Sequence, residues 1–182
     1  YNFDFFNTAN IFFSKDGLVL FSICNHEMQN CRIVALSSSN DSLYNIDALS
    51  SDVFYNTQPI IVSHKSSKAL YFVSDRNGGF GGLDIWLSII DNDGKFGSPI
   101  NLGSKINSFD NDITPFYNQE EGMMYFSSNK KGGLGGFDIY KSKGALNLWE
   151  EPQNVQELNS PQDELYLTFY DAKLGHFSSN RK

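Results

Sequence analysis

Residues 70–86 recur as residues 124–140, and this duplication constrains the fold more than any other feature of the chain. Matched positions lie 54 residues apart throughout the segment, including Tyr71 with Tyr125 and a Gly-Gly-x-Gly-Gly motif in each copy. A self-similar segment that is rich in strand-forming residues is typical of radial or stacked β-repeats. The duplication therefore predicts a repeat architecture rather than a single closed domain.

The repeat extends beyond these two copies. Residues 176–182 match residues 125–131, and residues 12–22 form a divergent early copy with a Lys-Asp-Gly turn between two apolar runs. We therefore expect four blade-like repeats, the last of them incomplete. They span residues 7–50, 51–105, 106–157 and 158–182.

Each repeat contains a pattern of four short strands. In the second repeat we place the strands at about residues 59–64, 69–74, 84–90 and 96–102. The second strand is apolar at every position from Leu70 to Val73, which suits a sheet that is covered on both faces. No amphipathic helical pattern is present. The sequence predicts an all-β fold in which four-stranded antiparallel blades, about three and a half in number, form part of a larger β-propeller.

Composition excludes some classes of partner. The 182 residues are 40% hydrophobic and carry a net charge of −7, which disfavours a nucleic-acid partner. No apolar run approaches the roughly 20 residues that a membrane span requires. The chain begins at Tyr1 without a signal-peptide pattern, and propellers close with about four to eight blades. We therefore expect the chain to be a piece of a longer polypeptide.

The chain has two cysteines, Cys24 and Cys31, at facing ends of the second and third strands expected in the first repeat. Strands that face each other in a hairpin can bring two cysteines within disulfide range. A disulfide would imply an oxidising compartment, whereas two unpaired thiols would not. The spacing favours the disulfide and leaves both possibilities open.

The repeat motifs resemble a known family. They lie at residues 58–59, 70–76, 78–86, 99–103, 106–108 and 112–116. Together they resemble the WD-repeat-like propeller units of TolB type, in the version found in OmpA-family envelope proteins of Bacteroidota. The resemblance covers roughly residues 51–182 and, more weakly, residues 11–36. The first repeat departs from the pattern because its cysteines stand where the other repeats have the glycine motif.

The resemblance implies a location and a role. Such propellers are modules of periplasmic or outer-membrane-associated proteins, and one family member belongs to the type IX secretion system. The resemblance therefore implies other envelope proteins as partners. Peptidoglycan binding in the family belongs to a separate domain that is absent from this chain, and so it is carried over to no residue here.

The two glycine motifs could be mistaken for phosphate-binding loops. A dinucleotide fingerprint would need a following helix, whereas Ile85 and Trp86 continue as a strand. We instead expect tight connections with positive φ, in which an aspartate accepts hydrogen bonds from loop amides. The residues expected in this structural role are Gly78, Gly79, Gly81, Gly82, Asp84, Gly132, Gly133, Gly135, Gly136 and Asp138.

No constellation of catalytic, cofactor or metal-binding residues stands out. Residues 91–94 resemble the opening of a calcium loop but lack its distal Glu, and so a surface turn is favoured. His26, His64 and His176 are too far apart in sequence to suggest a metal site. We expect the acids between the repeats to be solvated charges on a rim. These acids are Asp110, Asp112, Asp163 and Glu164.

The leading hypothesis is a non-catalytic scaffold that docks envelope proteins through its rim loops, without a cofactor. The alternative is a carbohydrate-binding or glycan-hydrolysing propeller. That alternative would use the rim acids together with exposed aromatic side chains such as Trp86 and Trp149. A third option is a substrate-gating propeller of a larger hydrolase.

Overall fold

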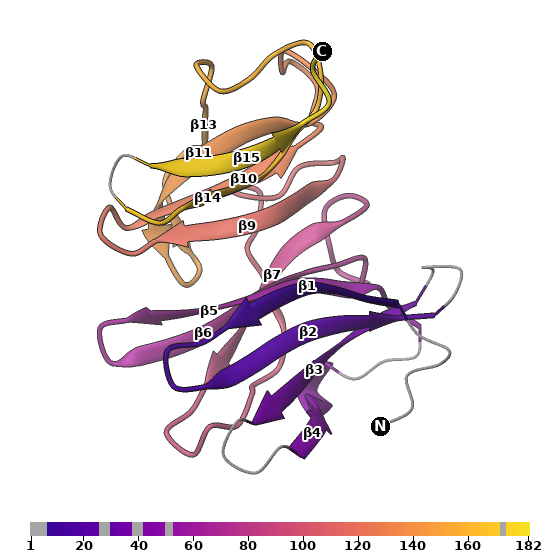
Figure 1. The fold of residues 1–182 in the computed structure, drawn as a ribbon, viewed down its shortest axis with the longest axis vertical. Helices are drawn as coiled ribbons and strands as arrows, with labels where there is room; N and C mark the ends of the chain where they lie inside the picture. The colour runs from indigo at the N-terminus through magenta and orange to yellow at the C-terminus, as the bar shows by residue number, and fades with distance from the viewer. Residues whose placement is uncertain (1–6, 26–29, 38–41, 50–52, 172–173) are drawn as a thin grey trace. The chain divides into compact units, whose positions relative to one another are not determined.

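The structure of the protein, a computed structural model, describes residues 7–25, 30–37, 42–49, 53–171 and 174–182. These residues form β-strands joined by turns, together with one short 3₁₀ helix, η1 (Asp47–Leu49), as Figure 1 shows. Among them, no helix is long and apolar enough to cross a membrane. The prediction of an all-β fold built from four-stranded antiparallel sheets is confirmed.

The strands follow one another through four sheets. The first sheet has the order β1 (Asn7–Phe13), β2 (Leu18–Cys24), β3 (Cys31–Ser37) and β4 (Ser42–Asn45). The second has the order β5 (Asn56–His64), β6 (Ser67–Ser74), β7 (Asp84–Ile90) and β8 (Ile100–Asn101). In the third, β9 (Asp112–Asn118) pairs with β10 (Met123–Ser128), which pairs with β11 (Asp138–Ala145). Two short strands, β12 (Leu148–Trp149) and β13 (Gln153–Asn154), pair with β11, and β14 (Glu164–Phe169) pairs with β15 (Gly175–Ser179).

The edge strands differ from those predicted for the second repeat. β5 begins at Asn56, three residues before the predicted start. The predicted fourth strand is reduced to the two-residue β8 and a single bridge between Ile90 and Phe96. Gly97 and Pro99 lie within that segment, and proline cannot donate a ladder hydrogen bond. The outer strand is therefore interrupted.

A bulge recurs at the same place in the first strand of every repeat. In β1, β5, β9 and β14 the pairing register shifts, and one residue within each shift has a positive φ. These residues are Asn10 (φ 55°), Gln58 (φ 53°), Thr114 (φ 53°) and Tyr166 (φ 57°). A left-handed conformation at a residue other than glycine is strained, and so its fourfold recurrence marks an architectural feature of the repeat. The divergent first repeat shares this feature.

The chain divides into two compact units. Unit 1 consists of Tyr1–Asn77 and Trp86–Ile100, and unit 2 consists of Gly78–Ile85 and Asn101–Lys182. Within unit 1, a core joins the first two sheets. Its buried residues are Leu20, Ile33, Ala35, Ile46, Leu49, Leu70, Phe72, Trp86 and Ile90.

Within unit 2, a second core joins the third sheet to the β14–β15 hairpin. Tyr125, Ile139, Val155 and Leu167 form its buried centre. Phe116 and Phe169 pack at its edge, with ring centroids 6.0 Å apart. The second strands of the second and third repeats are buried at consecutive positions, since Leu70 to Val73 are at most 1% exposed and Met124 to Phe126 at most 7%. This explains why both strands are apolar without alternation.

Candidate functional site

The glycine loop between β6 and β7 folds around the carboxylate of Asp84. Its Oδ2 accepts a hydrogen bond from the amide of Phe80 at 2.5 Å, and its Oδ1 accepts one from Gly81 at 3.3 Å. In the third repeat, Asp138 accepts the same two bonds from the corresponding loop amides, at 2.5 and 3.2 Å. Both aspartates are 1% exposed. Each carboxylate therefore holds its own loop, and its Oδ2 also accepts a hydrogen bond from an asparagine of the following short strand, Asn101 at 2.9 Å or Asn154 at 3.2 Å.

The loop glycines are required for two different reasons. Gly78 and Gly132 have φ values of 89° and 93°, which favour glycine. Gly81 and Gly135 instead lie so close to carbonyl oxygens of the next connector that a β-carbon would clash with backbone. The expectation of positive φ therefore holds at Gly78 and Gly132, whereas close packing against backbone explains Gly81 and Gly135. The remaining glycines of the motif, Gly79, Gly82, Gly133 and Gly136, lie in the same loops.

Two asparagines clamp the third strands to the connectors that follow them. The Asn107 side chain accepts a hydrogen bond from the amide of Ile85 at 2.8 Å and donates one to its carbonyl at 2.9 Å. Asn159 makes the same pair of bonds with Ile139, at 2.7 and 2.9 Å. The role of these residues was not predicted, although an Asn-Ser pair recurs in the two connectors, as Asn107-Ser108 and Asn159-Ser160. The clamps leave little freedom at the base of either glycine loop.

In the second, third and fourth repeats, a polar residue at the start of the first strand interacts with the end of the second strand. In unit 1, Asn56 Oδ1 accepts a hydrogen bond from Arg76 Nη2 at 2.6 Å. In unit 2, Asp112 and Glu164 occupy the corresponding positions, and both are fully buried. The prediction that these two acids are solvated rim charges is wrong, because each side chain accepts hydrogen bonds from a serine four residues earlier.

In the second, third and fourth repeats, a basic residue that follows the second strand lies over an aromatic ring. The Arg76 guanidinium is 4.9 Å from the ring centroid of Phe72, and Lys130 Nζ is 3.8 Å from that of Tyr140. Burial lowers the pKa of Arg76 to about 10 and also lowers the pKa of Lys130. These cations have a structural role, since their charged groups contact aromatic rings of their own repeats.

Large apolar side chains remain exposed at the tips of the glycine loops. The central residue of each motif is Phe80 or Leu134, and these side chains are 42% and 52% exposed. The backbone of Phe109, whose side chain is 88% exposed, lies against Gly81 beside the first tip. Pro161 occupies the corresponding place beside the second tip. We call these exposed side chains, Phe80, Phe109 and Leu134, the loop-tip surface of unit 2.

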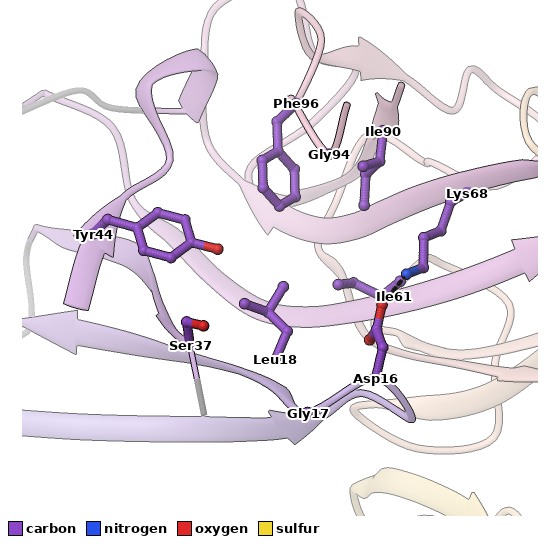
Figure 2. A pocket seen from close by; sticks show the side chains of 10 residues that line it. All are labelled: Asp16, Gly17, Leu18, Ser37, Tyr44, Ile61, Lys68, Ile90, Gly94 and Phe96. Atoms are coloured by element: carbon purple, nitrogen blue, oxygen red, sulfur yellow. Dashed lines mark hydrogen bonds and ion pairs between the residues drawn. The ribbon is translucent and has the colours of Figure 1, made fainter. Parts of the chain in front are cut away.

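Unit 1 contains a cavity of about 230 Å³ (Figure 2). Leu18, Ile61, Ile90 and Phe96 surround it, and the side chain of Tyr44 points into it from the opposite side. The polar groups around the cavity are Asp16, Lys68 and Ser37, with Gly17 and Gly94 completing the lining. Lys68 donates a hydrogen bond to Asp16 Oδ2, and this ion pair lowers the pKa of Asp16 to about 2. The cavity could not be predicted from the sequence, because its lining comes from six strands and two turns.

Cys24 and Cys31 are joined in a disulfide, with sulfur atoms 1.98 Å apart. They are directly paired across β2 and β3, with α-carbons 4.0 Å apart, and both are buried. The bond therefore closes the hairpin of the first repeat at the place where the other repeats carry a glycine loop.

The turn at residues 91–94 and two of the three histidines lie within the described residues. Asp91 Oδ1 accepts hydrogen bonds from the amides of Asp93 at 3.0 Å and Lys95 at 2.8 Å, which is the geometry of a surface turn. Among the described residues, no group of three or more His, Cys, Asp or Glu side chains is placed to hold a metal ion. His64 and His176 lie in different units, and His26 is outside the described residues.

The two tryptophans are not exposed platforms. Trp86 is 6% exposed and donates a hydrogen bond to the carbonyl of Ser74 at 3.2 Å, while Trp149 is 9% exposed and donates one to Leu146 at 2.9 Å. The prediction that they are exposed is wrong, because Trp86 lies in the core that joins the first two sheets and Trp149 packs edge-on against Tyr117. The carbohydrate-binding alternative thereby loses the two tryptophans that were named for it.

No protein-family model matches this chain, and no curated protein matches it.

Proposed function

We propose that this chain is a non-catalytic scaffold module that docks protein partners through the loop-tip surface. The observation that carries this proposal is the exposure of Phe80, Phe109 and Leu134 on loops that are held by hydrogen bonds to buried carboxylates. Exposed apolar side chains on a rigid support are a recurring feature of protein interaction sites. The loops need no bound group to account for their shape, since Asp84 and Asp138 satisfy the amides.

We further propose that these partners are proteins of the cell envelope, and that the module acts in the periplasm or at the periplasmic face of the outer membrane. The blade-like sheets fit a β-propeller of the TolB type, and the motif resemblance to envelope proteins of Bacteroidota supports this location. The disulfide is consistent with an oxidising compartment. A role linked to type IX secretion is the most specific form of the proposal.

Capture from an envelope extract tests the docking surface. The immobilised chain is compared with a double variant, Phe80→Ser and Phe109→Ser, and with Leu148→Ser as a matched control. Leu148 is 76% exposed in a different hairpin of unit 2, and so its variant loses a similar apolar side chain elsewhere. We expect the native chain and the control to capture the same amount of the same partner. The double variant should capture at least tenfold less of it. Equal capture by all three chains would contradict the proposal.

A further inference from the structure

The apolar core of unit 1 reaches the surface at the cavity shown in Figure 2. Leu18, Ile61 and Phe96 are partly buried and pack against the core, and Ile90 belongs to the core itself. A floor that continues into a packed core is preformed, because its side chains are already held by their neighbours. A ligand group that enters the cavity therefore meets apolar surface without having to order it.

The polar groups at the lip of the cavity already have partners. Asp16 accepts hydrogen bonds from Ser14 Oγ at 2.5 Å and from Lys68, and Ser37 also has partners. The adjacent turn is closed by a bond from the amide of Gly94 to the carbonyl of Asp91 at 3.1 Å. A saccharide would give up its hydrogen bonds to water and regain few here, which disfavours binding. The neutral ion pair likewise offers no net charge to an ionic ligand.

The volume limits what can enter. A cavity of about 230 Å³ exceeds the roughly 150 Å³ that accommodates benzene. It is smaller than the roughly 300–1,000 Å³ of pockets that enclose a whole small-molecule ligand. The space therefore suits one ring or one branched alkyl group.

A polar depression adjoins the cavity and shares Asp16, Lys68, Ile90 and Gly94 with it. Its other lining residues come from two hairpin tips of the same unit. They are Ser63, Lys65, Ser66, Ser67, Asp91, Asn92 and Asp93. Lysines and aspartates together give this surface both signs of charge beside hydroxyl groups, which complements the polar backbone of a peptide segment. An apolar pocket bordered by a polar surface is the arrangement of a protein interaction hot spot.

We propose that the cavity of unit 1 accepts one uncharged apolar side chain, branched aliphatic or aromatic, presented by a segment of a partner protein that lies along the polar depression. This inference rests on the proposed docking function and adds a second contact, with a stated chemistry, to it. The partner side chain replaces water against Leu18, Ile61 and Phe96, while its backbone faces the hairpin tips.

Titration of the purified chain with capped amino acids tests the inference. N-acetyl-leucinamide and N-acetyl-phenylalaninamide are the probes, N-acetyl-serinamide and N-acetylglucosamine are the controls, and amide chemical shifts report binding. We expect saturable shifts at Leu18, Ile61 and Lys68 with the two apolar probes and none with the controls. Saturable binding of the sugar in their place, or no binding of either apolar probe, would overturn the inference.

Two cavity variants and one matched control locate the binding. Tyr44→Ser removes an exposed wall of the cavity, and we expect it to weaken probe affinity about threefold to tenfold. Tyr170→Ser, at a tyrosine that is 69% exposed in unit 2, is the matched control and should leave affinity unchanged. Leu18→Phe fills the cavity and should abolish binding. If that variant does not fold, the comparison of Tyr44→Ser with Tyr170→Ser tests the inference. Equal probe affinity in these two variants would overturn it.

The two proposals fail separately. Loss of probe binding with intact capture through Phe80 and Phe109 would remove the cavity contact and leave the docking function standing. If the loop-tip double variant captures envelope proteins as well as the native chain does, while the apolar probes still bind, the loop-tip docking function is removed and the cavity contact stands.

Discussion

The third and fourth repeats contain the same buried anchor in two versions. Glu164 accepts hydrogen bonds from Ser160, at 2.9 and 2.6 Å, and from Ser179 at 2.9 Å, and it forms an ion pair with Arg181 at 3.2 Å. Asp112 accepts bonds from the amide and hydroxyl of Ser108 through Oδ2, at 2.5 and 2.8 Å. Its Oδ1 is buried and has no hydrogen-bond partner among the described residues.

The difference follows from side-chain length. Asp112 is one methylene shorter than Glu164, and Lys130 replaces the forked guanidinium of Arg181 with a single ammonium group. Lys130 lies over the ring of Tyr140 instead. Burial accordingly raises the pKa of Asp112, while the nearby Ser128 and Ser108 act in the opposite direction. The comparison teaches that a repeat can preserve a backbone position while its electrostatic balance changes.

The largest difference between these repeats should come from their second strands. Phe126 is 1% exposed, whereas the corresponding Phe177 is only partly buried. We expect Phe126→Ala to lower the free energy of unfolding by about 3–5 kcal/mol and Phe177→Ala by about 1–2 kcal/mol. Urea unfolding of both variants measures the difference. Equal losses would mean that the two strands are packed alike.

The second largest difference in unfolding free energy should come from the buried anchors, Glu164 and Asp112. Glu164→Ala leaves two serines and Arg181 without their acceptor, and we expect a loss of about 2–4 kcal/mol in unfolding free energy. Asp112→Ala removes fewer bonds together with an unsatisfied buried oxygen, and so its loss should be about 1 kcal/mol. Both residues lie in unit 2, which makes their urea transitions comparable. A larger loss at Asp112 would reverse the comparison.

Exchange of the anchor residues should make the contribution of the third repeat to stability more like that of the fourth. We expect the double variant Asp112→Glu with Lys130→Arg to gain about 1 kcal/mol in unfolding free energy, because the longer pair can form the missing contact. A double-mutant cycle with the two single variants measures the coupling. Additive effects of the two substitutions would show that the contact does not form.

The smallest effect concerns pH and arises from a single carboxyl group. The folded-state pKa of Asp112 is raised above its ordinary value of 3.8, and so the folded chain binds this proton more tightly than the unfolded chain. Stability from this group should therefore rise as pH falls through the raised pKa and decline as pH increases. Asp112→Asn should remove this dependence, which unfolding curves at several pH values would reveal. An unchanged pH profile in the variant would contradict the assignment.

Much of the fold could be predicted from the repeat, because strand residues and turn glycines recur at fixed offsets. The bulges could not, since Gln58, Thr114 and Tyr166 are not typical of positive φ. Pro59 and Pro115, which follow two of them, were the only local sign. The burial of Asp112 was also hidden, because a carboxylate at a strand start resembles a turn residue until its serine partners are in place.

The candidate sites show the same division. The glycine motifs and Asp84 could be located as one structural element from spacing alone, and so could the pairing of Cys24 with Cys31 as one of two possibilities. Trp86 was assigned to the surface because nothing in its neighbourhood along the chain shows which sheet covers it. The cavity beside Tyr44 could not be found at all, since its walls are distant in sequence.

By itself, the sequence determined the all-β class and the order of the repeats, because local propensity and periodic turns act over a few residues at a time. Only the tertiary structure decided which buried polar side chains have hydrogen-bond partners and which apolar side chains are exposed. Glu164 is buried and paired, Asp112 is buried and half-paired, and Phe80 remains at the surface. Burial and hydrogen bonding depend on partners brought from other strands, and side chains that differ by one methylene can then have different partners.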